Sequence, residues 1–219
     1  MKKYSILVLF FFLCIQLNAQ HGEFTFKPEE ARQKLIEGNQ RFLSSAPIEK
    51  DFNFELKDAA NGQHPYATIL TCSDSRVPPE IIFDESIGKL FIIRVAGNII
   101  DPVTLGSIEY AVEHLGCSYV LVLGHNHCGA VKATISGGDF SPSITEIAKL
   151  ITPAVKKAEE SNPRKEDFVD LAIKENVLLQ IKYASEMSES LAHLIKEGKI
   201  EIGGAIYNIS TGEIDFIEK

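Results

Sequence analysis

The sequence lacks tryptophan and contains only four cysteines among its 219 residues. Four cysteines are too few to form a disulfide scaffold in a chain of this length, so each one needs its own explanation. Basic residues are also in the minority, because 22 lysines and arginines stand against 30 aspartates and glutamates, a formal charge of −8. This balance argues against nucleic-acid binding and against docking on anionic lipid, since both require a basic face.

The remaining composition is that of a globular protein, with 45% hydrophobic and 24% charged residues, and the length suits one domain. One hydrophobic run stands apart: Ile6–Ile15 follows two lysines and precedes Leu17-Asn18-Ala19. This arrangement is typical of a secretory signal peptide, and the run is too short for a comfortable membrane span. We therefore expect residues 1–19 to be a signal peptide and residues 20–219 to form an exported domain, periplasmic or secreted, that does not bind the membrane after cleavage.

Signal cleavage changes both the charge and the cysteine count. Loss of Lys2 and Lys3 takes the formal charge from −8 to −8 − 2 = −10, and Cys14 leaves with them. An uncleaved N-terminal anchor is the alternative, whereas the large side chains before Cys14 disfavour a lipoprotein. Three cysteines then remain: Cys72, Cys117 and Cys128. An odd number without an obvious pairing, in an exported protein, points to thiolates that bind a metal, while Cys117 is expected to pack as a small buried hydrophobe.

Apolar runs predict the strands. Strands are expected at 66–72, 90–96, 119–124 and 202–208. Such near-continuous hydrophobic runs are typical of a parallel sheet that is covered on both faces. The turn Ser210-Thr211-Gly212 predicts a hairpin, so a last strand at 213–218 should be antiparallel. The sequence therefore predicts a single α/β domain with a mostly parallel β-sheet, an antiparallel C-terminal edge strand and an N-terminal helical arm.

Helical spacing of apolar residues predicts the helices. They are expected at 28–43, 105–115, 165–183 and 186–197. A further helix should begin near Ser143, where Ser-Ile-Thr-Glu is typical of a capping box closed by Glu146. Pro153 should end or kink that helix, because proline lacks the backbone donor.

Two groups of reactive side chains each follow a predicted strand. The segment Cys72-Ser73-Asp74-Ser75-Arg76 follows the first strand, and His125-Asn126-His127-Cys128-Gly129 follows the third. Sites in open parallel sheets form beyond the C-terminal ends of the strands, so both groups should share one edge.

Cys72, His125 and Cys128 together offer two thiolates and one imidazole. This donor set suits Zn²⁺, and three protein ligands leave the fourth position for water, as in catalytic zinc sites. The alternative is a buried thiol beside an ordinary core histidine. Two reactive groups at the same edge of the sheet favour zinc.

Asp74 and Arg76 stand two residues apart, so in an extended segment both side chains point to one side. Asp74 could bind the metal and close the site. It could instead pair with Arg76, whose fork-shaped guanidinium suits a carboxylate, and accept a proton from a metal-bound water. A simple structural ion pair is the third possibility.

The whole pattern resembles the β-class carbonic anhydrases. The segment Cys72–Arg76 followed by His125 and Cys128 matches the metal signature of that family. Further similar blocks follow in the family's order at 35–42, 94–98, 106–111 and 204–207. Each block alone is weak, but their common order is highly specific.

The resemblance implies roles for individual residues. Cys72, His125 and Cys128 would bind one Zn²⁺ per chain, and Asp74 and Arg76 would be the catalytic dyad. Gln63 would donate a hydrogen bond to bicarbonate, with Phe91 and Tyr110 as the substrate-binding apolar wall and tyrosine of one subgroup. In that subgroup these residues reach the site from a neighbouring subunit, which implies a homodimer or higher even oligomer. From the residues alone, core packing is the favoured interpretation of Phe91 and Tyr110.

The function implied is reversible hydration of CO₂ to bicarbonate and a proton through a zinc-bound hydroxide. The lack of tryptophan disfavours the subgroup that has a regulatory Trp-Arg-Tyr bicarbonate site. His127 is a candidate proton carrier. The alternatives are a related zinc hydrolase acting on carbonyl sulfide or carbon disulfide, a non-catalytic zinc-binding module, and redox sensing through Cys72 and Cys128.

Overall fold

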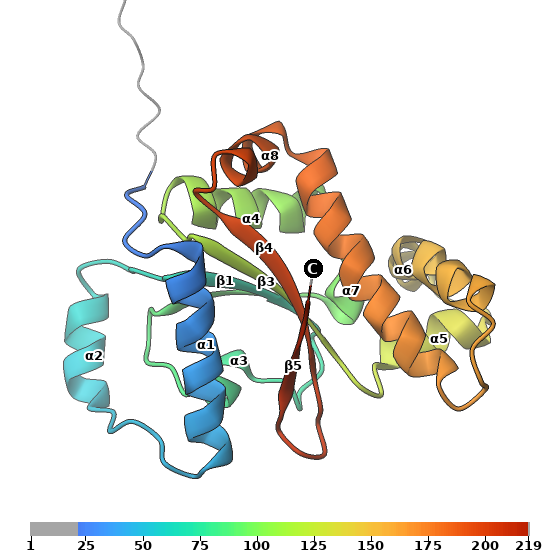
Figure 1. Cartoon of the computed structure of the whole chain (residues 1–219), viewed down its shortest axis with the longest axis horizontal. Coiled ribbons are helices and arrows are strands. Elements are labelled where there is room, and N and C mark those ends of the chain that lie inside the picture. Colours follow the sequence, from blue (N-terminus) through green and yellow to red (C-terminus); the bar gives the residue numbers. More distant parts are fainter. Residues whose placement is uncertain (1–21, 219) are drawn as a thin grey trace, which may run out of the picture.

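A five-stranded β-sheet forms the centre of the molecule in the computed structural model, which describes residues 22–218 (Figure 1). The strands are β1 (Ala67–Thr71), β2 (Leu90–Arg94), β3 (Tyr119–His125), β4 (Glu201–Tyr207) and β5 (Ile214–Ile217). Their order across the sheet is β2-β1-β3-β4-β5. β5 alone is antiparallel to its neighbour, so the predicted α/β fold with an antiparallel edge strand is confirmed.

The helices cover both faces of this sheet. They are α1 (Pro28–Leu43), α2 (Phe52–Ala59), α3 (Pro79–Ile82), α4 (Pro102–Glu113), α5 (Gly129–Ser136), α6 (Pro142–Glu160), α7 (Phe168–Met187) and α8 (Glu189–Lys196), with a 3₁₀ turn at Ala96–Asn98. Residues of α1 and α3 pack on one face of the strands, and residues of α4, α7 and α8 pack on the other. α5, α6 and α7 enclose a third cluster, which contains Cys72 and Cys128.

The register of the sheet brings the two reactive segments together. β1 and β3 are parallel neighbours in which Thr71 pairs with Leu123, and the Thr71 hydroxyl donates to the Leu123 carbonyl at 2.9 Å. Cys72 therefore follows β1 at the edge where His125 ends β3. The C-terminal ends of two adjacent strands thus deliver the predicted ligands to one place.

α6 departs from the sequence prediction at two points. It begins at Pro142 with Ser141 as its N-cap, and Glu146 accepts from Lys149 at 2.6 Å, so the predicted capping box is wrong. The helix also continues through Pro153 to Glu160, so of the two outcomes predicted for this proline, an end or a kink, the end does not occur. Buried residues around the proline pack in the same cluster as residues of α7, and tertiary packing of this kind stabilises a helix despite one missing donor.

Three short helices, α2, α3 and α5, do not appear in the sequence prediction. α2 begins where the carboxylate of Asp51 accepts from the backbone amides of Asn53 and Phe54. None of the residues of α2 is buried, and Phe52, Phe54 and Leu56 are 58–68% exposed. α2 therefore presents an apolar surface that residues 22–218 leave uncovered.

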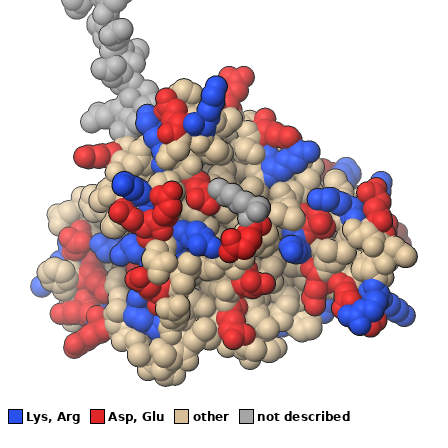
Figure 2. Space-filling view, viewed as in Figure 1, with Lys and Arg blue, Asp and Glu red and all other residues tan. Residues whose placement is uncertain are grey.

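The predicted signal peptide at residues 1–19 lies outside the described residues. Within residues 22–218, none of the helices combines the length and apolar character needed to span a membrane. Acidic and basic side chains are interspersed over the face of the molecule that Figure 2 shows.

Candidate metal centre

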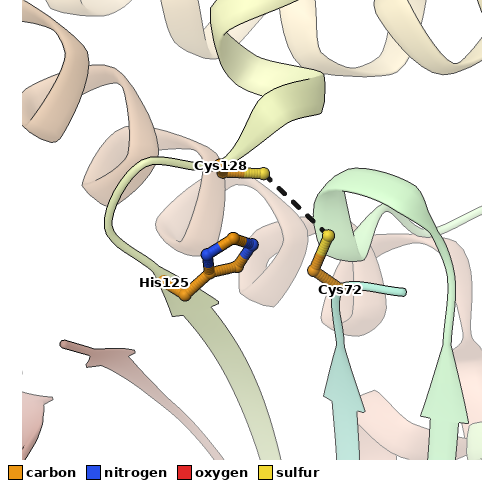
Figure 3. A group of neighbouring side chains, drawn as sticks. All are labelled: Cys72, His125 and Cys128. Carbon is orange, nitrogen blue, oxygen red and sulfur yellow. Dashed lines mark hydrogen bonds between the residues drawn. The ribbon is translucent and has the colours of Figure 1, made fainter. Parts of the chain in front are cut away.

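Cys72, His125 and Cys128 converge at the C-terminal edge of the sheet (Figure 3). Their ligand atoms all lie within 4.8 Å of one another, and all three residues are buried. The two sulfurs are 4.0 Å apart, and neither forms a disulfide. Two sulfurs bound at about 2.3 Å to a tetrahedral zinc would lie roughly 3.8 Å apart, so this spacing fits the ion.

The ring of His125 is oriented for a metal. Its Nδ1 lies 2.9 Å from the carbonyl oxygen of Asn126, so a proton on Nδ1 donates to that oxygen and leaves a lone pair on Nε2. Nε2 is buried and finds no hydrogen-bond partner among the described residues. A buried polar atom without a partner is costly, and a bound zinc ion would satisfy it.

The two thiols form one electrostatic unit. Hydrogen bonding from Cys128, supported by the Gly97 amide, lowers the pKa of Cys72 to about 4. The pKa of Cys128 is raised, because its thiol donates to Cys72 and because it is buried. Cys72 is therefore a thiolate at neutral pH, and a cation that replaces the remaining proton would be bound by two thiolates.

Asp74 pairs with Arg76 rather than joining the ligands. Its two carboxylate oxygens accept from the Arg76 Nε at 2.9 Å and Nη2 at 2.7 Å, and one also accepts from the Arg76 backbone amide at 3.0 Å. These bonds hold the pKa of Asp74 well below its usual range. Its Oδ2 lies 3.9 Å from the Nε2 of His125, so an ionised carboxylate stands beside the ligand group without being part of it.

Comparison with known proteins identifies the family. The family model for carbonic anhydrase matches residues 67–214. The carbonic anhydrase of Mycolicibacterium smegmatis is 35% identical over 195 residues, which cover 86% of this chain and 92% of that protein. The carbonic anhydrase of Synechococcus elongatus is 34% identical over 194 residues, covering 83% and 70%.

Two solved structures are also similar. A structure of the β-carbonic anhydrase CcaA superposes with a TM-score of 0.69 and 30% identity, covering 87% of this chain and 92% of that one. A tetrameric β-carbonic anhydrase of Sordaria macrospora gives 0.69 and 26%, covering 75% and 86%. The chain belongs to the β-class carbonic anhydrases. Enzymes of this class use zinc and hydrate CO₂.

Arg94 positions the loop that carries two of the key residues of this carbonic anhydrase. From the end of β2, its Nη2 donates to the carbonyl of Asp74 at 2.6 Å and its Nε donates to the carbonyl of Cys72 at 3.3 Å. The sequence marked Arg94 as part of a family block without giving it a role. Its contacts span about 20 residues and depend on β1 and β2 being neighbours.

Asn126 and Asn208 position the other ligand loop. The Asn126 amide group donates to Asn208 Oδ1 at 3.0 Å, and its own oxygen accepts from the backbone amide of Ile209 at 2.9 Å. Asn126 is also the residue whose carbonyl faces His125. The turn after β4 therefore fixes the carbonyl that orients the histidine, and sequence analysis missed this contact because it joins residues 82 positions apart.

The remaining predicted site residues lie elsewhere in the same chain of this carbonic anhydrase. Gln63 precedes β1, whereas Cys72 follows it, and Gln63 lines a cavity of about 700 Å³ together with His64 and Tyr66. The ring centroids of Phe91 and Tyr110 are 6.1 Å apart.

Core packing accounts for only one of these two rings. Phe91 is partly buried against the α4 side of the core, as the core interpretation predicts, but Tyr110 is 48% exposed. The cavity that Gln63 lines contains none of Cys72, His125 and Cys128, and Phe91 packs in a different cluster from the two cysteines.

Two other residues singled out in the sequence lie outside the ligand group. His127 is exposed, adopts a left-handed φ of 58° and has its Nδ1 3.4 Å from the Lys132 ammonium. Cys117 is fully buried, as predicted, and its thiol donates to the carbonyl of Pro65 at 3.4 Å. Burial raises the pKa of Cys117 to about 11, so this thiol stays protonated at neutral pH.

Proposed function

We propose that this β-carbonic anhydrase is a zinc enzyme that converts CO₂ and water reversibly into bicarbonate and a proton at the Cys72, His125 and Cys128 centre. The observation that carries the proposal is the buried ligand group beside an Asp74 held by Arg76, in which the Nε2 of His125 has no hydrogen-bond partner within residues 22–218. When bound, Zn²⁺ supplies a Lewis acid that lowers the pKa of water from 15.7 to about 7.

The residues around the centre divide the remaining work. Asp74 stays ionised at neutral pH because Arg76 holds its pKa low. It accepts a hydrogen bond from the attacking hydroxyl group and thereby orients a lone pair of the hydroxyl oxygen toward CO₂. Arg76 keeps the carboxylate in this orientation, since it binds both oxygens of Asp74.

The direct test combines metal analysis with turnover. Purified protein should contain about one zinc per chain and hydrate CO₂ in a stopped-flow assay, whereas Cys72→Ser should do neither. A zinc-loaded wild type without turnover above that variant would overturn the proposal. The sulfur-analogue and non-catalytic alternatives are not favoured, because the relatives are named carbonic anhydrases and both Asp74 and Arg76 are present.

We further propose that a partner subunit completes the site, in a homodimer or higher even oligomer. Gln63 would donate to a bicarbonate oxygen, and Phe91 and Tyr110 would line the CO₂ side. In support, these residues lie away from the ligand group of their own chain, and Tyr110 is half-exposed. The exposed apolar residues of α2 offer further surface for a subunit contact, and a similar solved structure is described as tetrameric.

Light scattering on the purified protein tests this assembly. An even number of subunits is expected at micromolar concentration. Full turnover by a monomer would contradict a site shared between subunits.

Export is the last part of the proposal, and it rests on the sequence of residues 1–19. Mass spectrometry of protein recovered from the periplasm or medium should give a chain that begins near residue 20. Full-length protein confined to the cytoplasm would contradict export.

A further inference from the structure

Two buried amide side chains on α7 hold the loop at residues 95–101, which joins β2 to α4 and contacts Cys72 through Gly97. Asn176 is 1% exposed and Gln180 is fully buried, and they lie one helical turn apart. The Asn176 Nδ2 donates to the carbonyl of Gly97 at 2.9 Å, and the Gln180 Oε1 accepts from the amide of Ile100 at 2.7 Å. The Gln180 Nε2 donates to the Asn176 Oδ1 at 3.1 Å, so the two amides act as one connected unit.

The loop held in this way ends on a metal ligand. The backbone amide of Gly97 donates to the sulfur of Cys72 at 3.4 Å. Gly97 has a left-handed φ of 73°, and a Cβ at this position would lie 2.6 Å from the Cδ1 of Ile151 and 3.2 Å from the Cβ of Ala130. The loop is therefore confined by α5 and α6 on one side and tied to α7 on the other, which leaves its amide aimed at the thiolate.

We propose that Asn176 and Gln180 are positioning residues of the metal centre, which fix the Gly97 amide on Cys72 and thereby set the zinc affinity of that sulfur. The inference rests on the proposed zinc site. Burying two amides in a helix face that is otherwise apolar costs free energy unless every polar atom is paired. Partners beyond the ligands themselves orient metal ligands and tune their donor strength.

A matched control exists at the other side of the sheet. Asn39 on α1 is 5% exposed, and its Nδ2 donates to the carbonyls of Ile82 and Gly212 at 3.0 and 2.9 Å. It joins chain segments as Asn176 does, but its partners belong to α3 and the β4–β5 turn rather than to the loop on Cys72. Replacing either asparagine by leucine removes a buried amide of the same kind.

The experiment compares Asn176→Leu with Asn39→Leu in the full chain, stripped of metal and titrated with Zn²⁺ against a chelator, and separately with Co²⁺. We expect Asn176→Leu to weaken zinc binding by about 10-fold or more. Its cobalt form should show the thiolate charge-transfer band at longer wavelength, because a sulfur without its amide donor is easier to oxidise. Asn39→Leu should lower the melting temperature without shifting the cobalt band. It should weaken zinc binding less than Asn176→Leu does, because its bond to Gly212 reaches the other ligand loop only through Asn208 and Asn126.

Wild-type zinc affinity and an unshifted cobalt band in Asn176→Leu, with the same stability loss as Asn39→Leu, would overturn the inference. If Asn176→Leu does not fold, Gln180→Met removes the Gln180 bonds at similar side-chain length and should cause a smaller change in the same direction. Unchanged metal binding in that variant would also overturn it. A wild type that binds zinc without hydrating CO₂ would refute the proposed function and leave these binding results intact.

Discussion

The two ends of the parallel sheet are built in different ways. At the C-terminal end, one chain supplies the buried ligands Cys72, His125 and Cys128, and polar contacts within that chain hold both ligand loops. At the N-terminal end, Gln63 lines an open cavity, and Tyr110 on α4 is half-exposed. The proposed metal half of the site lies within one chain, whereas the proposed substrate half is presented outward.

Physical chemistry explains this division. Thiolates and an imidazole that share one metal must be buried and fixed, and a partly satisfied polar network is costly, so the same chain has to provide it. An exposed tyrosine or phenylalanine costs little in the isolated chain and gains contacts when a second surface covers it. The comparison therefore predicts that changes at the C-terminal end act within one subunit and changes at the N-terminal end act across two.

The largest expected effect is the loss of a ligand. Cys72→Ser or Cys128→Ser replaces a thiolate by a hydroxyl that remains protonated, so we expect zinc content near zero and turnover at the uncatalysed rate. Elemental analysis and stopped-flow CO₂ hydration measure both. Cys117→Ser is the matched control, because Cys117 is equally buried but lies outside the ligand group, and it should keep its zinc. Zinc retained at one per chain in Cys72→Ser would contradict the ligand assignment.

The second largest expected effect is a loss of turnover without a loss of zinc. Asp74→Asn keeps the shape but turns one acceptor into a donor, so we expect turnover to fall about 100-fold with zinc content unchanged. Asp84→Asn provides the control, because Asp84 is another low-pKa carboxylate, paired with Arg41 and Lys50. That variant should lose stability and keep its turnover per folded chain. An equal loss of turnover in both variants would show that any broken ion pair has this effect.

A smaller effect tests whether the N-terminal end of the sheet in one subunit and the C-terminal end in its partner form one site. We expect Cys72→Ser and Gln63→Ala to be nearly inactive alone. In a mixed dimer, one site combines both defects and the other combines intact ligands with an intact partner glutamine. Random mixing should therefore restore about one quarter of the wild-type activity. No recovery in a mixture shown by native mass spectrometry to contain mixed dimers would place Gln63 and the ligands of its own chain in one site.

The ligand end of the sheet is predictable from the sequence because its signals are local. Apolar runs predicted four of the strands and the turn Ser210-Thr211-Gly212 predicted the fifth, and parallel strands that end at one edge bring Cys72 and His125 together without further information. What the sequence does not predict depends on contacts between distant segments. Asn176 and Gly97 stand 79 positions apart, and nothing around Asn176 marks it as more than a polar residue in a helix.

α6 also shows where local sequence rules stop predicting the structure. Local rules for Ser143 predicted a later start than the structure has, and Pro153, predicted to end or kink the helix, does not end it. Packing against α7 decided the length of this helix. Local chemistry predicts where a site forms, and tertiary packing decides which other side chains support it.

The smallest expected effect concerns pH and compares two ion pairs. The folded-state pKa values of Asp74 and Asp84 are both lowered, so each carboxylate stabilises the folded chain above its unfolded pKa of about 3.9. That contribution is lost as pH falls from about 4 through the folded pKa. Water screens the pair of Asp74 more strongly, since Arg76 and Asp74 are 50% and 16% exposed, whereas Arg41 and Asp84 are 30% and 3% exposed.

Urea unfolding of the metal-free protein at pH 7 and pH 3 measures this difference. Asp84→Asn should lose more free energy of unfolding than Asp74→Asn at pH 7. Both losses should become smaller at pH 3 without vanishing, because the unfolded carboxyl groups are then mostly protonated while the folded Asp74 is still ionised. The larger loss in Asp74→Asn would mean that the metal-side ion pair also supports the fold. The Asp74–Arg76 pair would then stabilise the fold as well as serve catalysis. The contrast between this pair and the Asp84 pair, which serves stability alone, would break down.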